Sequence, residues 1–69
     1  MYKDMDGNTI KIGDILEPAE GRRVRVISEG YSDGVGEKVL YGQQLEDMDA
    51  FSILTADNLA RQFRKVAMS

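Results

Sequence analysis

The stretch that decides the fold is DGNTIKIGDILEPAEGRRVRVIS, residues 6–28. It alternates turn signals with short β-prone runs. Asp6-Gly7 favours a hairpin turn, because glycine accepts positive φ and aspartate bonds to the following backbone. Gly13 marks a second break, and the stretch from Pro18 to Gly21 marks a third. A chain interrupted this often predicts short antiparallel strands rather than long helices.

The runs between these turns predict the strands. We expect five strands, at residues 2–5, 9–12, 22–28, 38–41 and 50–54, with a short apolar run at residues 15–16. In the second run Ile10 and Ile12 share one face. The run 22–28 is the clearest, because Val24 and Val26 alternate with arginines, which is typical of one buried and one solvated face. Ile27 breaks that alternation and predicts a bulge. The glycine-rich segment 29–38 is expected to be a hairpin loop.

In the C-terminal segment the spacing of apolar residues changes from the two-residue period of a strand to that of a helix. Thr55 is a good helix N-cap, followed by Asp57 at the positive end of the helix dipole. Leu59, Phe63 and Val66 follow at helical spacing and form one apolar stripe. We therefore expect a helix over residues 56–65. The alternative is a shorter helical turn followed by a last strand over residues 63–67.

Composition limits the chemistry. The 69 residues contain no cysteine and no histidine, which removes the commonest general base and the commonest metal ligands. A net charge of −3 argues against non-specific duplex binding. No apolar run approaches the ~18 residues of a membrane span, and the first residues lack the apolar core of a signal peptide. We expect one cytoplasmic domain, residues 1–69, that is not an enzyme and needs no cofactor, metal or membrane.

Five short strands joined by tight turns favour a small barrel, which also removes exposed strand edges. The phrases DGNTIKIGDIL and GRRVRVI resemble the opening of Src-homology-3-like barrels of the KOW type, and similar layouts occur in small proteins of phages and prophages. The matching residues are Ile10, Gly13, Asp14, Ile15, Gly21, Val24 and Val26.

The resemblance implies a mainly β fold, a five-stranded barrel with a short C-terminal helix, and a phage or prophage origin. The alternative is an α+β fold in which one helix packs on an antiparallel sheet. The acidic middle of the chain departs from the nucleic-acid-binding KOW pattern.

Several motifs fail as functional signatures. In the segment GYSDGVGEK, residues 30–38, Glu37 separates the last glycine from Lys38, and a strand rather than a helix is expected to follow. The segment therefore does not match a phosphate-binding loop. Asp4-x-Asp6-Gly7 lacks the glycine and glutamate spacing of a calcium loop, so we interpret it as a turn. An acidic cluster at residues 46–49 is best interpreted as a solvated loop. Phe51 and Phe63 are expected in the core.

The candidate binding residues are basic or aromatic. They are Arg22, Arg23, Arg25, Tyr31, Arg61, Arg64 and Lys65. The six basic members could form one face for phosphates or an acidic protein, or could pair with nearby carboxylates. Residues 29–57 carry seven acidic side chains against Lys38 alone. Tyr31 could stack on a base or anchor a partner, or could cover the open end of a barrel.

We therefore expect a non-enzymatic binding module that acts through a protein partner or through self-association, of which a homodimer is one form. A chain this small gains stability from dimerisation. The alternative is a nucleic-acid-binding protein that uses the arginine-rich strand face.

Overall fold

The computed structural model describes residues 2–66. The elements follow the order β1 (Ile15–Pro18), β2 (Val24–Ser32), β3 (Glu37–Gln44), β4 (Phe51–Leu54), α1 (Ala56–Gln62) and β5 (Phe63–Lys65). All five strands are antiparallel and belong to one sheet in the order β4-β3-β2-β1-β5. The mainly β fold with a short C-terminal helix is thus confirmed. The sheet does not close, because β4 and β5 are its two edges.

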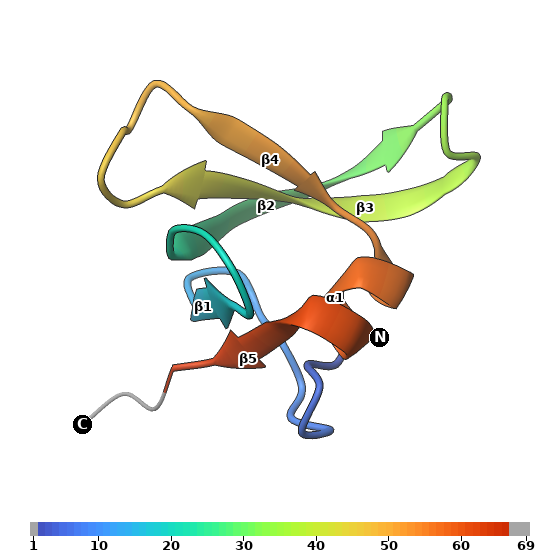
Figure 1. The fold of residues 1–69 in the computed structure, drawn as a ribbon. Coiled ribbons are helices and arrows are strands. Elements are labelled where there is room, and N and C mark those ends of the chain that lie inside the picture. Colours follow the sequence, from blue (N-terminus) through green and yellow to red (C-terminus); the bar gives the residue numbers. More distant parts are fainter. Residues whose placement is uncertain (1, 67–69) are drawn as a thin grey trace.

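The sheet bends on itself to enclose the core. Figure 1 shows β2, β3 and β4 as one twisted layer, with β1, β5 and α1 beneath it. The core lies between these layers and consists of small aliphatic side chains: Ile10, Leu16, Val24, Val26, Leu40, Leu54 and Leu59. Tyr2 and Phe63 pack against it.

The first residues of β2 have the burial pattern that their alternation predicts, but the strand ends later than predicted. Val24 and Val26 are buried while Arg23 and Arg25 are exposed, and the register shifts between Val26 and Ser28, so the predicted bulge is confirmed. The predicted end at residue 28 is wrong, because β2 continues to Ser32 and only residues 33–36 form the turn.

Gly30 explains why the longer strand is possible. A Cβ placed on Gly30 would clash with the ring of Tyr41, on the neighbouring strand β3. The missing side chain therefore leaves room for Tyr41 to lie across β2, and the glycine does not signal a loop.

The segment before β1 forms no regular strand pair. The strands expected at residues 2–5 and 9–12 are reduced to a single bridge between Lys3 and Thr9. Gly7 has a φ of 83°, as the predicted turn requires. Ile10 is buried but Ile12 is 62% exposed, so the two side chains do not share one environment as the predicted common face would require. The Asp14 carboxylate accepts a 2.7 Å hydrogen bond from the Lys11 amide. The turn that this bond closes interrupts the extended strand that we expected over residues 9–12.

For the C-terminal segment the structure shows the alternative, a short helix followed by a strand. Thr55 caps α1 by accepting a 3.1 Å hydrogen bond from the Asn58 amide. The helix ends at Gln62, and Phe63 turns into an extended conformation that begins β5. Residues 63–65 pair with β1 instead of continuing the helix, so tertiary pairing overrides the helical stripe. Ala67, the last residue of the expected strand, lies outside the described residues.

Candidate functional site

The predicted basic residues do not form one uncompensated face. Arg22 pairs with Glu46 at 3.3 Å, Arg61 with Asp57 at 3.4 Å, and Lys65 with Asp14 at 3.4 Å. Arg61 lies on α1, whereas Lys65 lies on β5. Their positive charge is thus neutralised locally, at three separate places.

Arg23 and Arg64 belong to an alternating row of charges. Arg23 contacts Glu17 at 3.1 Å, Glu17 lies opposite Arg64 in the β1–β5 ladder, and Arg64 contacts Asp6 at 2.7 Å. Two cations and two carboxylates alternate along this row, so it presents no net charge. Within residues 2–66, Arg25 is the one predicted arginine without a salt bridge.

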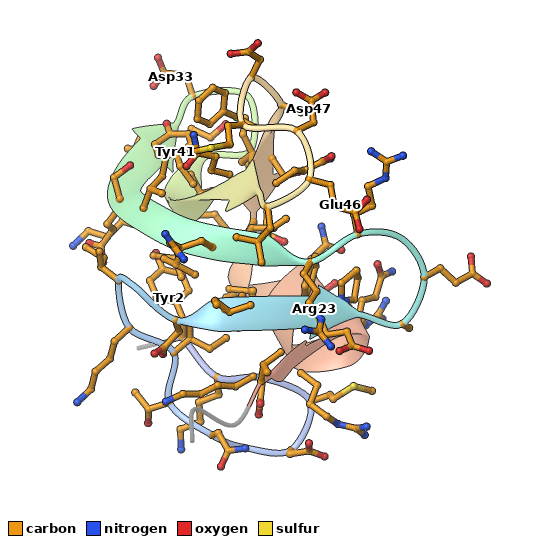
Figure 2. The ribbon with its side chains drawn as sticks, turned by 90° about the vertical axis from the view of Figure 1, so that its left-hand side faces the viewer. Tyr2, Arg23, Asp33, Tyr41, Glu46 and Asp47 are labelled. Atoms are coloured by element: carbon orange, nitrogen blue, oxygen red, sulfur yellow. The ribbon has the colours of Figure 1, made fainter. Side chains whose placement is uncertain are left out.

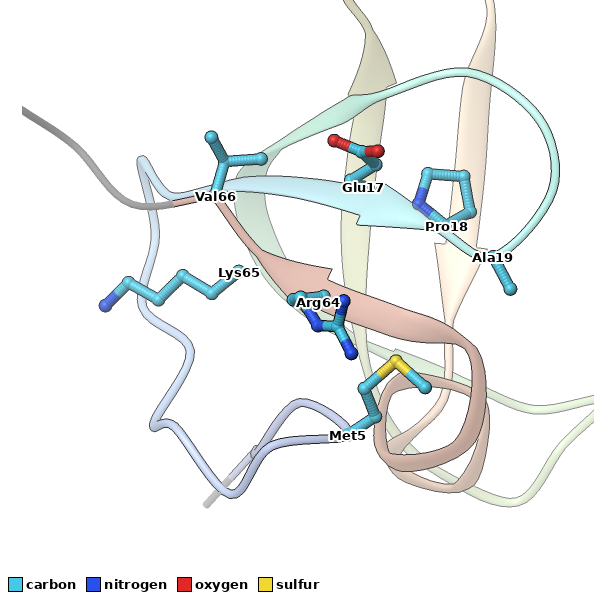
Figure 3. A pocket seen from close by; sticks show the side chains of 7 residues that line it. All are labelled: Met5, Glu17, Pro18, Ala19, Arg64, Lys65 and Val66. Atoms are coloured by element: carbon cyan, nitrogen blue, oxygen red, sulfur yellow. The ribbon is translucent and has the colours of Figure 1, made fainter.

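A surface hollow of about 490 Å³ lies beside this row. Figure 3 shows it between β1 and β5, with Met5 on the opposite side and Arg64 in the centre. Because the guanidinium of Arg64 already contacts Asp6 and the ammonium of Lys65 contacts Asp14, the hollow offers no free cation for an anionic ligand. Other hollows of about 400 to 470 Å³ occur on the surface, so size does not single this one out.

Tyr2 lines one of the other hollows together with Glu29 and Glu37. Burial raises the pKa of the Tyr2 phenol, and the two carboxylates raise that pKa further. The phenol therefore stays protonated at neutral pH and serves as packing against the core rather than as a base.

One further candidate residue, Tyr31, lies apart from these. Tyr31 is exposed and sits opposite Lys38, near the β2–β3 turn, away from the arginines of the β1–β5 region. Among residues 2–66 no group of three or more acidic side chains is arranged to hold a metal ion. The described part of the chain also contains no helix with the length and apolar character needed to cross a membrane.

The feature that sequence reasoning missed is the outer face of the β3–β4 pair. Phe51 and Ile53 on β4 are 60% and 54% exposed, which overturns the prediction that Phe51 is core. They lie opposite Gln43 and Tyr41 of β3, and Met48 extends this apolar surface in the preceding loop. A four-residue alternating strand does not reveal which of its faces points inward.

We call this surface, formed by Tyr41, Gln43, Met48, Phe51 and Ile53, the outer face. Neither α1 nor another strand covers it, because α1, β1 and β5 all lie on the other side of the β2–β4 layer (Figure 1). Gln43 fixes the adjacent loop by donating a 2.9 Å hydrogen bond to the Met48 carbonyl. The outer face is therefore held in place and apolar while remaining exposed.

Comparison with known proteins places the chain in no group: no family model, curated protein or solved structure matches it.

Proposed function

We propose that this protein is a non-enzymatic interaction module whose outer face binds a protein partner. The observation that carries the proposal is the exposure of Phe51 and Ile53, side by side on an edge strand. Exposed aromatic and aliphatic side chains that are grouped, rather than scattered, mark interaction surfaces. The rim of this surface is polar, as in protein interfaces generally.

Selection from a peptide library displayed on phage tests the proposal. The bait is the intact protein, and the double variant Phe51→Lys with Ile53→Lys serves as the counter-bait. Ile12→Lys is the matched control, because Ile12 is as exposed as Phe51 but lies outside the outer face. We expect enriched peptides that bind the wild type and the control but not the double variant.

Self-association is an alternative use of the same surface, and sedimentation velocity over a wide concentration range measures it. A dimer that the double variant abolishes also supports an interaction module. A protein that stays monomeric and enriches no peptide, or peptides that bind the double variant equally well, would refute the proposal.

A second candidate function is nucleic-acid binding, which Arg25 favours because it lacks a carboxylate partner. The other five predicted cations are each matched by a carboxylate, so we rank this function second. A phage or prophage origin stays a prediction, which neighbouring capsid, tail or replication genes would test.

A further inference from the structure

The two edges of the sheet are treated differently. The open side of β5 is covered by the N-terminal segment: the Met5 amide donates to the Phe63 carbonyl at 2.9 Å, and the Lys65 amide donates to the Asp4 carboxylate at 2.8 Å. The Phe63 amide is bonded to the Leu59 carbonyl. This edge therefore has little capacity left to pair with another strand.

The edge strand β4 has no such cover within residues 2–66. The Gln44 amide donates to the Ala50 carbonyl at 3.0 Å, which fixes the phase of the β3–β4 ladder. Because bonded and non-bonded pairs alternate in an antiparallel ladder, Ser52 and Leu54 direct their backbone groups to β3. Phe51 and Ile53 direct theirs away from the sheet.

Apart from its length of four residues, the strand lacks the usual protections of an edge. Its sequence, FSIL, contains no proline and no charged residue, and the strand shows no bulge against β3. The open edge thus offers the amide and carbonyl groups of two residues, next to their exposed apolar side chains. This is the geometry by which sheets accept an additional strand from another chain.

The charged residues near the β4 edge indicate which side chains an added partner strand would carry. Asp47 and Asp49 precede β4, and Asp33 lies in the turn at the other end of the β2–β3 hairpin. None of the three forms a salt bridge with another described residue. Figure 2 shows Asp47 beside Glu46 in the loop that precedes β4, whereas Figure 1 places the turn that contains Asp33 at the opposite end of the β2–β4 layer. Arg25, the predicted arginine without a salt bridge, lies on β2, two strands away from the β4 edge.

A second copy of the chain fits this edge poorly. Two antiparallel β4 strands would bring Asp47 and Asp49 of each copy towards Asp57 of the other. Arg61 already pairs with Asp57 in its own chain, so it supplies no free cation. Like charges that face one another disfavour this arrangement.

We infer that the open edge of β4 accepts an extended segment of a partner protein in which lysine or arginine alternates with apolar residues. Backbone hydrogen bonds to Phe51 and Ile53 hold the segment, its apolar side chains extend the outer face, and its cations meet Asp47 and Asp49 at the start of β4. The inference rests on the proposed function and specifies the chemistry of the partner.

The test is a titration with a labelled decapeptide of alternating lysine and valine, followed by fluorescence anisotropy and by amide exchange in NMR spectra. We expect saturable binding that weakens with salt and slowed exchange at the amides of Phe51 and Ile53. Asp47→Asn with Asp49→Asn should weaken binding about tenfold. Glu20→Asn, which removes an exposed carboxylate that forms no salt bridge, is the matched control and should leave affinity unchanged.

Three results would overturn the inference. These are no binding of the peptide, equal binding of a decapeptide of alternating glutamate and valine, and binding without slowed exchange at Phe51 and Ile53. In each case, library peptides that lose binding to the Phe51→Lys, Ile53→Lys variant would still support the proposed function. The two proposals can therefore fail separately.

Discussion

The carboxylate of Asp4 accepts a 2.8 Å hydrogen bond from the backbone amide of Lys65, a residue 61 positions later in the chain. The same carboxylate accepts hydrogen bonds from the amides of Asp6 and Asn8 at 2.9 and 2.8 Å. Asp4 is only 3% exposed and is the one buried charged side chain of residues 2–66. It holds the N-terminal turn against the outer side of β5, and so closes one edge of the sheet.

The first prediction concerns the removal of this carboxylate. Asp4→Ala leaves the Lys65 amide without its acceptor, and we expect a loss of about 1.5 to 3 kcal/mol in the free energy of unfolding. Urea denaturation measures the loss. Glu20→Ala, on the exposed turn between β1 and β2, should change stability by less than about 0.5 kcal/mol. Equal stability of the two variants would contradict the role assigned to Asp4.

The second prediction is the pH dependence that Asp4 confers. Burial acts to raise the pKa of Asp4, but hydrogen bonds from Lys65, Asn8 and Asp6 outweigh it and hold this pKa below its usual value. The folded state thus releases the proton more readily than the unfolded state. The stabilisation is complete above the unfolded pKa of about 3.9 and is lost as pH falls through the lower folded pKa.

Thermal unfolding of the wild type and Asp4→Asn between neutral and strongly acidic pH checks this sign. The stability difference between the two proteins should be largest near neutral pH and should shrink in acid. A difference that grows in acid would contradict it.

The third prediction uses the contact between Gly30 and Tyr41. A methyl group at position 30 would displace the Tyr41 ring, so Gly30→Ala should destabilise the fold by about 1 to 3 kcal/mol. The double variant Gly30→Ala, Tyr41→Ala should be no less stable than Tyr41→Ala, because the clash is absent. Additive losses in this double-mutant cycle would show that the ring does not lie on Gly30.

The fourth prediction addresses nucleic acid. Because five of the six predicted cations are neutralised by carboxylates, we expect only weak binding of a generic oligonucleotide even at low salt. Fluorescence anisotropy measures it. Tight binding that falls steeply with salt, and that Arg23→Glu with Arg25→Glu abolishes, would instead establish the nucleic-acid function.

Local sequence chemistry predicted the parts of the fold that depend on neighbouring residues. The Asp6-Gly7 turn, the buried faces of Val24 and Val26, the bulge at Ile27 and the cap at Thr55 are all observed. Each follows from backbone preference or from alternation within a few residues.

The missed features depend on contacts between distant segments. The burial of Asp4 involves the Lys65 amide, the glycine at position 30 accommodates the ring of Tyr41, and the exposure of Phe51 depends on how the sheet bends. The Asp4 side chain gave one local signal, since aspartate readily accepts hydrogen bonds from amides two residues on. No local sequence signal predicted the contact of Asp4 with β5. The candidate site was missed for the same reason, because a short alternating strand has two equivalent faces until it is packed.

The protein closes one edge of its sheet and, we propose, leaves the other edge open for a partner. Amide hydrogen exchange of the dilute free protein tests it most directly, residue by residue. We expect slow exchange at Ser52, Leu54 and Lys65, and fast exchange at Phe51 and Ile53. Slow exchange at Phe51 and Ile53 in the free monomer, or fast exchange at Lys65, would contradict it.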